Sequence, residues 1–374
     1  MLFRDPVLTE EELGVVGRVE ELRERLRLQL YEPRRWMGSL RRLSFARAIQ
    51  GSNSIEGFSA PLDDVAAAGE EPLDADTETT LALRGYRAAM TYVLQLANEE
   101  SFEYSEQLLK SLHFMMTGHD LRSRPGLWRM GAIYVRNDVT DETVYSGPDV
   151  DLVPKLMGEL VQHLQQDEGL PSMVRASMAH LNLVMVHPFR DGNGRMARCL
   201  QTLVLARDGV LAPQFCSIEE YLGRNTKAYY QVLGEVGGGS WQPDRDARAW
   251  VRFNLTAHFR QASTLLHRVK ESEQLWVELE RLVRRLGLHE RVIPALFDAA
   301  LGLRVRRATY RGMLEEDEIS EQAAGRDLRQ LAEKGALIPH GEKRGRYYTG
   351  SPQLLASWKA IRSNRSSANV DPFA

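Results

Sequence analysis

The fold is decided by one stretch of the sequence, residues 187–198, which is His-Pro-Phe-Arg-Asp-Gly-Asn-Gly-Arg-Met-Ala-Arg. Residues 172–186 before it and 194–209 after it both carry helical patterns. The first of these segments is apolar nearly all round, as a central helix is. Pro188 ends it, while Gly192 and Gly194 permit a tight turn with positive φ. The stretch therefore predicts two helices, one of them central, joined by a glycine-rich turn.

The start of the second helix is suited to binding an anion. Backbone N–H groups of Gly192, Asn193 and Gly194 point to one spot, and the positive end of the helix dipole lies behind them. Arg195 and Arg198 are three residues apart on one helix face. Positive charge in a first turn opposes the dipole at a cost of about 0.3–1 kcal/mol each. The two arginines together therefore predict an anionic ligand.

Two further residues of the stretch suit phosphate chemistry. A neutral imidazole at His187 can take a proton from an attacking hydroxyl, and Asp191 can hold Mg²⁺ against phosphate oxygens. Each residue also has a structural interpretation, with His187 and Asp191 as helix caps and the two arginines as partners of nearby acids. The combination within twelve residues favours the phosphate site. The spacing is not that of a P-loop, and His180, His187 and Asp191 do not share a helical face as metal ligands.

The stretch resembles the signature of the Fic (Fic/Doc) family, HPFx(D/E)GNGRxxR, at every fixed position. The helical patterns from about 105 to 235 are similar to the family's core. Residues 131–147, two β-rich runs around a polar turn, lie where the family has its flap hairpin, and residues 225–230 resemble its NxxxYY segment. The resemblance implies a mainly α fold with a small β-hairpin. It also implies transfer of AMP from ATP to a Ser, Thr or Tyr hydroxyl of a target protein, or of the chain itself.

The resemblance assigns roles to individual residues. His187 would be the general base, and Phe189 would anchor the loop in the core. Arg195 would hold the β-phosphate and Arg198 the γ-phosphate, while Mg²⁺ would lie on Asp191. One of the two tyrosines assigned to the adenine pocket is as readily an ordinary core residue. The full set that would hold ATP and Mg²⁺ is Asp191, Gly192, Asn193, Gly194, Arg195, Arg198, Tyr229 and Tyr230.

Residues 52–57, Ser-Asn-Ser-Ile-Glu-Gly, resemble the family's inhibitory motif (S/T)xxxE(G/N). On its own this segment indicates only a Ser52-capped helix with Glu56 exposed. The resemblance implies instead that Glu56 pairs with Arg198 and competes with the γ-phosphate of ATP. In the family the same glutamate can also position a water molecule that removes AMP from a modified target. Adenylyl transfer and its reversal, and transfer of another nucleotide, all remain open at this stage.

The segment 289–350 has three helical patterns followed by two short β-rich runs, and this order resembles a winged helix-turn-helix. DNA binding is one interpretation, with phosphates meeting Arg326, Arg329, Lys343, Arg344 and Arg346. The acids Glu321, Asp327 and Glu333 lie on the same predicted helix and argue against it. We therefore expect a docking or dimerisation module first, and a nucleotide-sensing DNA-binding regulator as the alternative.

Composition bounds the remaining expectations. The chain has 374 residues, 43% hydrophobic and 26% charged, and 48 basic against 51 acidic residues leave a net charge of −3. That balance offers no overall basic excess for nucleic acid or membranes. The two cysteines, Cys199 and Cys216, form no CxxC pair. The N-terminus lacks the features of a secretory signal. We expect a cytoplasmic protein with no membrane partner, and a homodimer. The expected divisions are an N-terminal helical region (1–104), a catalytic core (105–240), linking helices (241–288), a winged-helix-like domain (289–350) and a polar tail (351–374).

Overall fold

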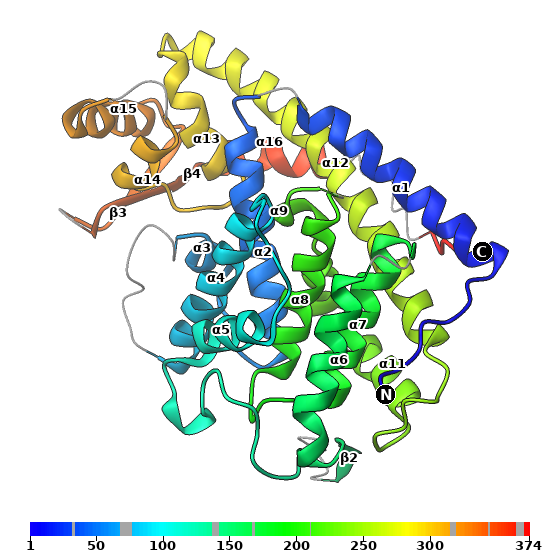
Figure 1. The fold of residues 1–374 in the computed structure, drawn as a ribbon. Helices are drawn as coiled ribbons and strands as arrows, with labels where there is room; N and C mark the ends of the chain where they lie inside the picture. The colour runs from blue at the N-terminus through cyan, green and yellow to red at the C-terminus, as the bar shows by residue number, and fades with distance from the viewer. Residues whose placement is uncertain are drawn as a thin grey trace.

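The computed structural model describes residues 1–31, 34–67, 77–136, 142–166, 169–209, 211–314, 319–342, 345–363 and 370–374. These residues form a mostly helical molecule with two small antiparallel hairpins, which confirms the expected fold class (Figure 1). The main helices before the site are α1 (Glu10–Tyr31), α2 (Met37–Ile55), α3 (Leu62–Ala67), α4 (Glu78–Leu96), α5 (Glu106–Thr117) and α6 (Val153–Gln165). Those that form and follow the site are α7 (Ser172–Val186), α8 (Asn193–Arg207), α9 (Pro213–Cys216), α10 (Glu219–Arg224), α11 (Thr226–Gly237) and α12 (Arg248–Leu286).

The central pair of helices is α7 and α8, as the sequence predicts. Nearly every side chain of both helices is buried, including those of Met178, Leu181, Met196 and Leu203. Figure 1 shows the two helices side by side in the middle of the molecule, with α2, α4 and α5 on one side and α6 and α11 on the other. Because the turn between α7 and α8 joins two buried helices, its position is fixed by the core.

The sequence predicts one helix start at Thr9, with Glu12 completing a capping box, and another at Ser105, and hydrogen bonds confirm both. Thr9 and Glu12 form a reciprocal capping box at α1, in which the Thr9 N–H donates to Glu12 Oε2 (2.9 Å) and the Glu12 N–H donates to Thr9 Oγ1 (3.4 Å). Ser105 caps α5 by accepting from the Leu108 N–H (3.1 Å).

Helix α2 is longer than the sequence pattern indicates. The pattern predicts an end near residue 50, whereas the helix continues to Ile55. Ser52 and Asn53 are fully buried. A Cβ at Gly51 would collide with the backbone of α10, so the glycine allows the two helices to pack backbone to backbone. Tertiary packing therefore extends the helix and places the 52–57 motif on its last turn.

The segment expected to link two domains is a single helix that belongs to both of their cores. Trp250 and Leu255, in the first half of α12, pack in the core around α7 and α8. Leu265 and Leu279, further along the same helix, pack in a second core with the C-terminal elements. Helix α1 runs beside α12 over much of its length (Figure 1).

The C-terminal segment has three helices and then a hairpin, in the predicted order. These elements are α13 (Ile293–Ala300), α14 (Arg307–Gly312), α15 (Glu321–Glu333), β3 (Leu337–His340) and β4 (Tyr347–Gly350). Lys343 and Arg344, at the predicted turn of this hairpin, lie outside the described residues.

The expected polar tail at 351–374 is wrong in its first part, because a helix, α16 (Pro352–Ser363), follows the hairpin. Leu354 and Ile361 are buried in the second core, and these two apolar anchors explain why the segment folds. At the end of the chain, the ring of Phe373 packs under Arg252, with the guanidinium carbon 3.9 Å from the ring centroid. Among the helices of the described ranges, none is both long and apolar enough to span a bilayer.

Candidate active site

His187 is the residue that ends α7, and its backbone is left-handed, with φ of 52°. Its Nδ1 lies 3.1 Å from the Val184 carbonyl oxygen. Because a carbonyl oxygen only accepts, Nδ1 carries the proton and Nε2 keeps its lone pair. Burial lowers the pKa of His187, while the carboxylates of Glu56 and Asp191 act in the opposite sense. The imidazole is therefore neutral at pH 7, and its Nε2 can accept a proton.

Arg129 holds the loop of His187 against the β-hairpin region. Its Nε donates to the His187 carbonyl (3.0 Å), and its terminal nitrogens donate to the carbonyls of Gly131 (2.6 Å) and Pro148 (2.5 Å). Its backbone N–H donates to the Pro188 carbonyl (2.8 Å). One buried guanidinium thus ties both ends of the hairpin segment to the loop of His187. No local pattern in the sequence marks Arg129, so its role could not be predicted from the sequence.

His113, on α5, is a second residue that the sequence analysis missed. Its ring stacks on Phe189 with centroids 3.7 Å apart. Its Nδ1 accepts from the Gly126 N–H (2.9 Å), so Nε2 carries the proton and donates to the Asp191 carbonyl (2.9 Å). Burial lowers its pKa to about 4, which keeps the ring neutral. His113 therefore fixes both the Phe189 anchor and the backbone of the turn.

The turn also carries an internal clamp. The Asn193 side chain accepts from the Phe189 N–H (2.9 Å) and donates to the Phe189 carbonyl (2.9 Å). Gly192 has φ of +74°, which a glycine adopts without strain. Asn193 thus shapes the turn with its side chain, and its backbone lies at the start of α8.

Arg195 is buried with unused hydrogen-bond donors. Its side chain is 2% exposed, and its Nε and Nη1 have no partner among the described residues. Its Nη2 lies 3.4 Å from Asp191 Oδ2, and the ring of Phe58 lies 5.2 Å from its guanidinium carbon. A buried unsatisfied donor costs about 1–3 kcal/mol. Such a group is suited to an anionic ligand that supplies the missing acceptors.

Arg198 is buried and its guanidinium is surrounded by acceptors from the N-terminal region. Its Nε donates to Ser52 Oγ (2.7 Å), and its Nη2 donates to the Ser52 carbonyl (3.0 Å) and to Glu56 Oε1 (2.7 Å). Burial opposes its charge, but Glu56 and the neighbouring tyrosine oxygens raise its pKa above the usual range. The structure therefore brings the 52–57 motif onto the arginine that the sequence analysis selected.

The Glu56 carboxylate also lies against the start of α8. A Cβ at Gly194 would overlap Glu56 Oε1 and come close to Arg198 Nη1. The glycine thus leaves room for an anion at the helix N-terminus, and Glu56 fills that room. An anionic ligand of Arg198 at this point would meet the carboxylate.

The two tyrosines of α11 differ in their surroundings. Tyr229 is 1% exposed, and its hydroxyl lies 3.0 Å from His180 Nε2 and 3.5 Å from Arg198 Nη1. Tyr230 is 49% exposed, and its hydroxyl donates to the Ile55 carbonyl (3.3 Å). Tyr229 is thus a core residue beneath Arg198, while Tyr230 presents its ring beside the end of α2.

Asp191 is the carboxylate available for a metal at this site. Its side chain is 61% exposed, next to the buried Arg195. Within the part of the chain that the structure describes, no three His, Cys, Asp or Glu side chains gather as a protein-only metal site. One exposed carboxylate fits Mg²⁺, which is commonly held by one or two carboxylates together with substrate phosphates.

The hairpin beside the loop consists of β1 (Tyr134–Arg136) and β2 (Thr143–Ser146), in antiparallel register. Its predicted turn, residues 137–141, lies outside the described residues. Strand β2 is bonded on its other side, where the Ser146 N–H donates to the Gly239 carbonyl (3.0 Å). Tyr145 anchors it by donating from its hydroxyl to the Met185 carbonyl (2.8 Å).

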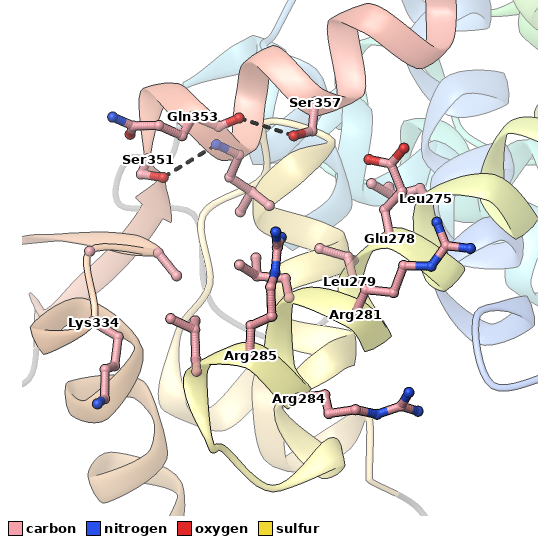
Figure 2. Close-up of a pocket in the computed structure, with 15 residues that line it drawn as sticks. Leu275, Glu278, Leu279, Arg281, Arg284, Arg285, Lys334, Ser351, Gln353 and Ser357 are labelled. Carbon is pink, nitrogen blue, oxygen red and sulfur yellow. Dashed lines mark hydrogen bonds between the residues drawn. The ribbon is translucent and has the colours of Figure 1, made fainter.

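A cavity of about 950 Å³ lies elsewhere, between the end of α12, the end of α15 and α16. Figure 2 shows Arg281, Arg284, Arg285 and Lys334 around it. None of the predicted site residues lines it. The candidate active site is therefore recognised by its chemistry and not by the size of a cavity.

The site lies in a segment with known relatives. Residues 103–205 match the model of the Fic/DOC family. A protein named protein adenylyltransferase Fic from Nematostella vectensis is 26% identical over 215 residues, covering 56% of this chain and 46% of that protein. Protein adenylyltransferase fic-1 from Caenorhabditis elegans is 30% identical over 163 residues, covering 42% of this chain and 29% of that protein. The chain spans less than half the length of these curated relatives.

Solved structures share the fold more widely. A Fic family protein from Desulfovibrio desulfuricans G20 aligns with a TM-score of 0.58 at 22% identity, over 93% of this chain and 98% of that one. Fic-1 (aa134–508) from Caenorhabditis elegans aligns with a TM-score of 0.55 at 22% identity, over 69% and 73%. At these identities the likeness establishes the fold.

Proposed function

We propose that the chain is a protein adenylyltransferase whose catalytic domain includes residues 103–205, the segment that matches the Fic/DOC family model. It transfers AMP from ATP to a Ser, Thr or Tyr hydroxyl of a target protein or of itself. The observation that carries the proposal is the arrangement around the turn. A neutral His187 with a free Nε2 lies beside a helix N-terminus that holds two buried arginines, one of them with unused donors.

In the proposed reaction, His187 Nε2 takes the proton of the acceptor hydroxyl, and the resulting oxygen attacks the α-phosphorus of ATP. The bond from the α-phosphorus to the bridging oxygen of the β-phosphate breaks, and pyrophosphate leaves. Arg195 supplies donors to the β-phosphate, and Arg198 receives the γ-phosphate. Mg²⁺ on Asp191 would neutralise charge on the α- and β-phosphates. A general base typically contributes about 10²–10⁴-fold to such a reaction.

We infer that the wild-type chain is autoinhibited. Glu56 lies on the guanidinium assigned to the γ-phosphate, at 2.7 Å. ATP in its productive pose must displace this carboxylate, and the triphosphate then replaces one anion with another. The same carboxylate lies near His187, where it could hold a water molecule for removal of AMP from a modified target. De-adenylylation at this site is therefore the second candidate function.

The hairpin supports a way to hold the target. Because β2 is bonded on its far side to residues near Gly239, β1 carries the open edge within the described residues. An extended target segment can add to this edge through main-chain hydrogen bonds, which select little sequence. Its hydroxyl would then lie over the loop that Arg129 ties to the hairpin.

Intact-protein mass spectrometry after incubation with ATP and Mg²⁺ tests the proposal. We expect the mass of one AMP to be added to Glu56→Gly and not to Glu56→Gly with His187→Ala. Wild type should show little or no adduct. An adduct of equal size on all three proteins would overturn the roles of both residues. If none of the three proteins is modified, self-modified protein is not available as a substrate for the reverse reaction. A synthetic AMP-modified peptide then takes its place, and loss of AMP from this peptide would support de-adenylylation.

A further inference from the structure

A second cavity, of about 800 Å³, lies between α14, the N-terminal half of α15 and the start of β4. Its lining is dominated by one residue type, with six arginines from three elements: Arg306, Arg307, Arg311, Arg326, Arg329 and Arg346. We call this surface the arginine cavity. It belongs to the second core of the molecule and shares no residue with the candidate active site. In the view of Figure 1, α14, α15 and β3 form one corner of the molecule, while β2 lies at the opposite end.

Among the described residues that line this surface, acids are few. Glu321 and Glu342 are the two carboxylates among the residues that line the cavity. Glu321 pairs with Arg311 at 3.7 Å, and both side chains are about half exposed or more. An exposed pair of this kind is worth about 0–1 kcal/mol, so it leaves the guanidinium available to a stronger anion. The acidic run at 315–318 lies outside the described residues and is not part of this count.

The acid that argues most strongly against an anion-binding role for α15 is not on the exposed face. Asp327 is 3% exposed and accepts two hydrogen bonds from Arg291, at 2.8 and 2.9 Å. It accepts a third from the Tyr310 hydroxyl at 3.0 Å. The Asp327 carboxylate therefore holds α15 against Arg291 and Tyr310 and does not face solvent. The sequence suggests that Asp327 argues against nucleic-acid binding. Because its side chain is buried, this part of the expectation is wrong.

The exposed face of α15 is basic and held in place. Arg326 and Arg329 are exposed, while Ala324, Leu328 and Leu331 anchor the opposite face. The Nε of Arg329 donates to the Gly325 carbonyl (3.1 Å), and this bond orients its guanidinium. On the hairpin, Arg346 makes a similar but longer contact with the Gly341 carbonyl (3.5 Å). Planar, oriented guanidiniums are suited to phosphate oxygens.

We propose that the arginine cavity binds the phosphate backbone of duplex DNA, with α15 at the mouth of the major groove and its exposed Arg326 and Arg329 on the phosphates that border it. A single exposed helix fits a major groove about 12 Å wide. Arginines on α14 and on the hairpin flank that helix and would meet the backbones on either side. Six guanidiniums on three elements present a row of contacts to a polymer of regularly spaced phosphates. The proposal concerns a different part of the molecule from the proposed transfer reaction and does not depend on it.

Fluorescence anisotropy with a labelled duplex of about 20 base pairs, two helical turns, tests the proposal. Wild type should bind, and the logarithm of its affinity should fall steeply with the logarithm of salt between about 50 and 200 mM. Each lost phosphate contact lowers this slope by about 0.9. Arg326→Gln with Arg329→Gln should therefore reduce the slope by about 2 and the affinity by about 60-fold at 0.1 M salt.

The matched control removes two arginines from the neighbouring cavity of Figure 2, as Arg281→Gln with Arg284→Gln, both exposed on α12. It has the same net charge as the test variant and should bind DNA within about twofold of wild type. All four arginines replaced in the two variants are exposed, so no core packing is lost, and equal thermal unfolding midpoints check the fold.

Three results would overturn the proposal. The first is no binding of duplex DNA at about 50 mM salt. The second is an equal loss in the control, which would mean attraction by net charge alone. The third is equally strong competition by poly-glutamate at matched charge, which would make the surface a docking site for an acidic protein.

Discussion

Replacing Glu56 by glutamine tests how strongly the carboxylate competes with ATP, because glutamine keeps the size of the side chain and removes its charge. In the structure, Arg198 donates to Glu56 at 2.7 Å, and a hydrogen bond with a charged partner contributes about 1.5–3 kcal/mol. The Glu56 side chain is 26% exposed, so solvent screening favours the lower part of this range. ATP that must displace the carboxylate loses this free energy on binding.

The expected gain in ATP affinity for Glu56→Gln follows directly. A free energy of about 1.5 kcal/mol corresponds to about tenfold, and 3 kcal/mol to about 150-fold. Isothermal titration with ATP and Mg²⁺ measures the change, with both proteins carrying His187→Ala so that no transfer accompanies binding. We expect the variant to bind ATP at least about tenfold more tightly than its parent.

Ser52→Ala is the matched control for this measurement. Ser52 accepts from the same guanidinium at 2.7 Å, but its hydroxyl carries no charge. Its loss leaves Glu56 in place, so ATP affinity should not rise. The reasoning is refuted if Glu56→Gln binds ATP no more tightly than its parent, or if Ser52→Ala produces the same gain.

Three further predictions concern the loop and its neighbours. Burial lowers the pKa of His187 below 6.5. The kcat/KM of Glu56→Gly should therefore stay level as the pH falls to about 6.5 and decline only below that pH. A decline centred above pH 7 would contradict a lowered pKa. His113→Ala removes the ring stacked on Phe189 and two hydrogen bonds. It should lower the free energy of unfolding, measured in urea, by about 2–3 kcal/mol. A change under about 0.5 kcal/mol would exclude a role of His113 in fixing the turn. Gly194→Ala should displace the flexible end of Glu56 and so cost wild type at most the carboxylate's hydrogen bond to Arg198, about 1.5 kcal/mol, and much less in the Glu56→Gly background. Additive effects in this cycle would contradict the contact.

The sequence predicts those parts of the molecule that depend on local patterns. The bounds of α7 follow from its apolar run and from the proline after it, and the capping pair Thr9 and Glu12 marks α1. The turn at 187–198 could be predicted as an anion site because its chemistry is contained in twelve consecutive residues. Features that depend on tertiary contacts could not be predicted from local patterns. The last turn of α2 forms because Gly51 lets α10 approach.

Partners far apart in the chain explain the other differences. Arg129 binds carbonyls on both sides of the hairpin, and His113 reaches the turn from α5, so neither is marked by its neighbours in sequence. Asp327 lies at a helical position that could face either way, and only the distant Arg291 and Tyr310 determine that it is buried. Residue type and spacing therefore predict the turn at 187–198 as a site, whereas the residues that position the turn become apparent only in three dimensions.

The way in which α2 meets Arg198 argues for release of Glu56 without movement of the helix. Ser52 is fully buried and accepts two of the three hydrogen bonds that Arg198 donates to residues 52–57. Glu56 lies one residue beyond the last helical turn, and its side chain is partly exposed. A rotation of the Glu56 side chain therefore frees one N–H of Arg198 Nη2, while the Ser52 hydroxyl and carbonyl keep the guanidinium in position. Under the proposed function the arginine would then stay oriented for the γ-phosphate, so inhibition would be a competition between two anions and could be partial.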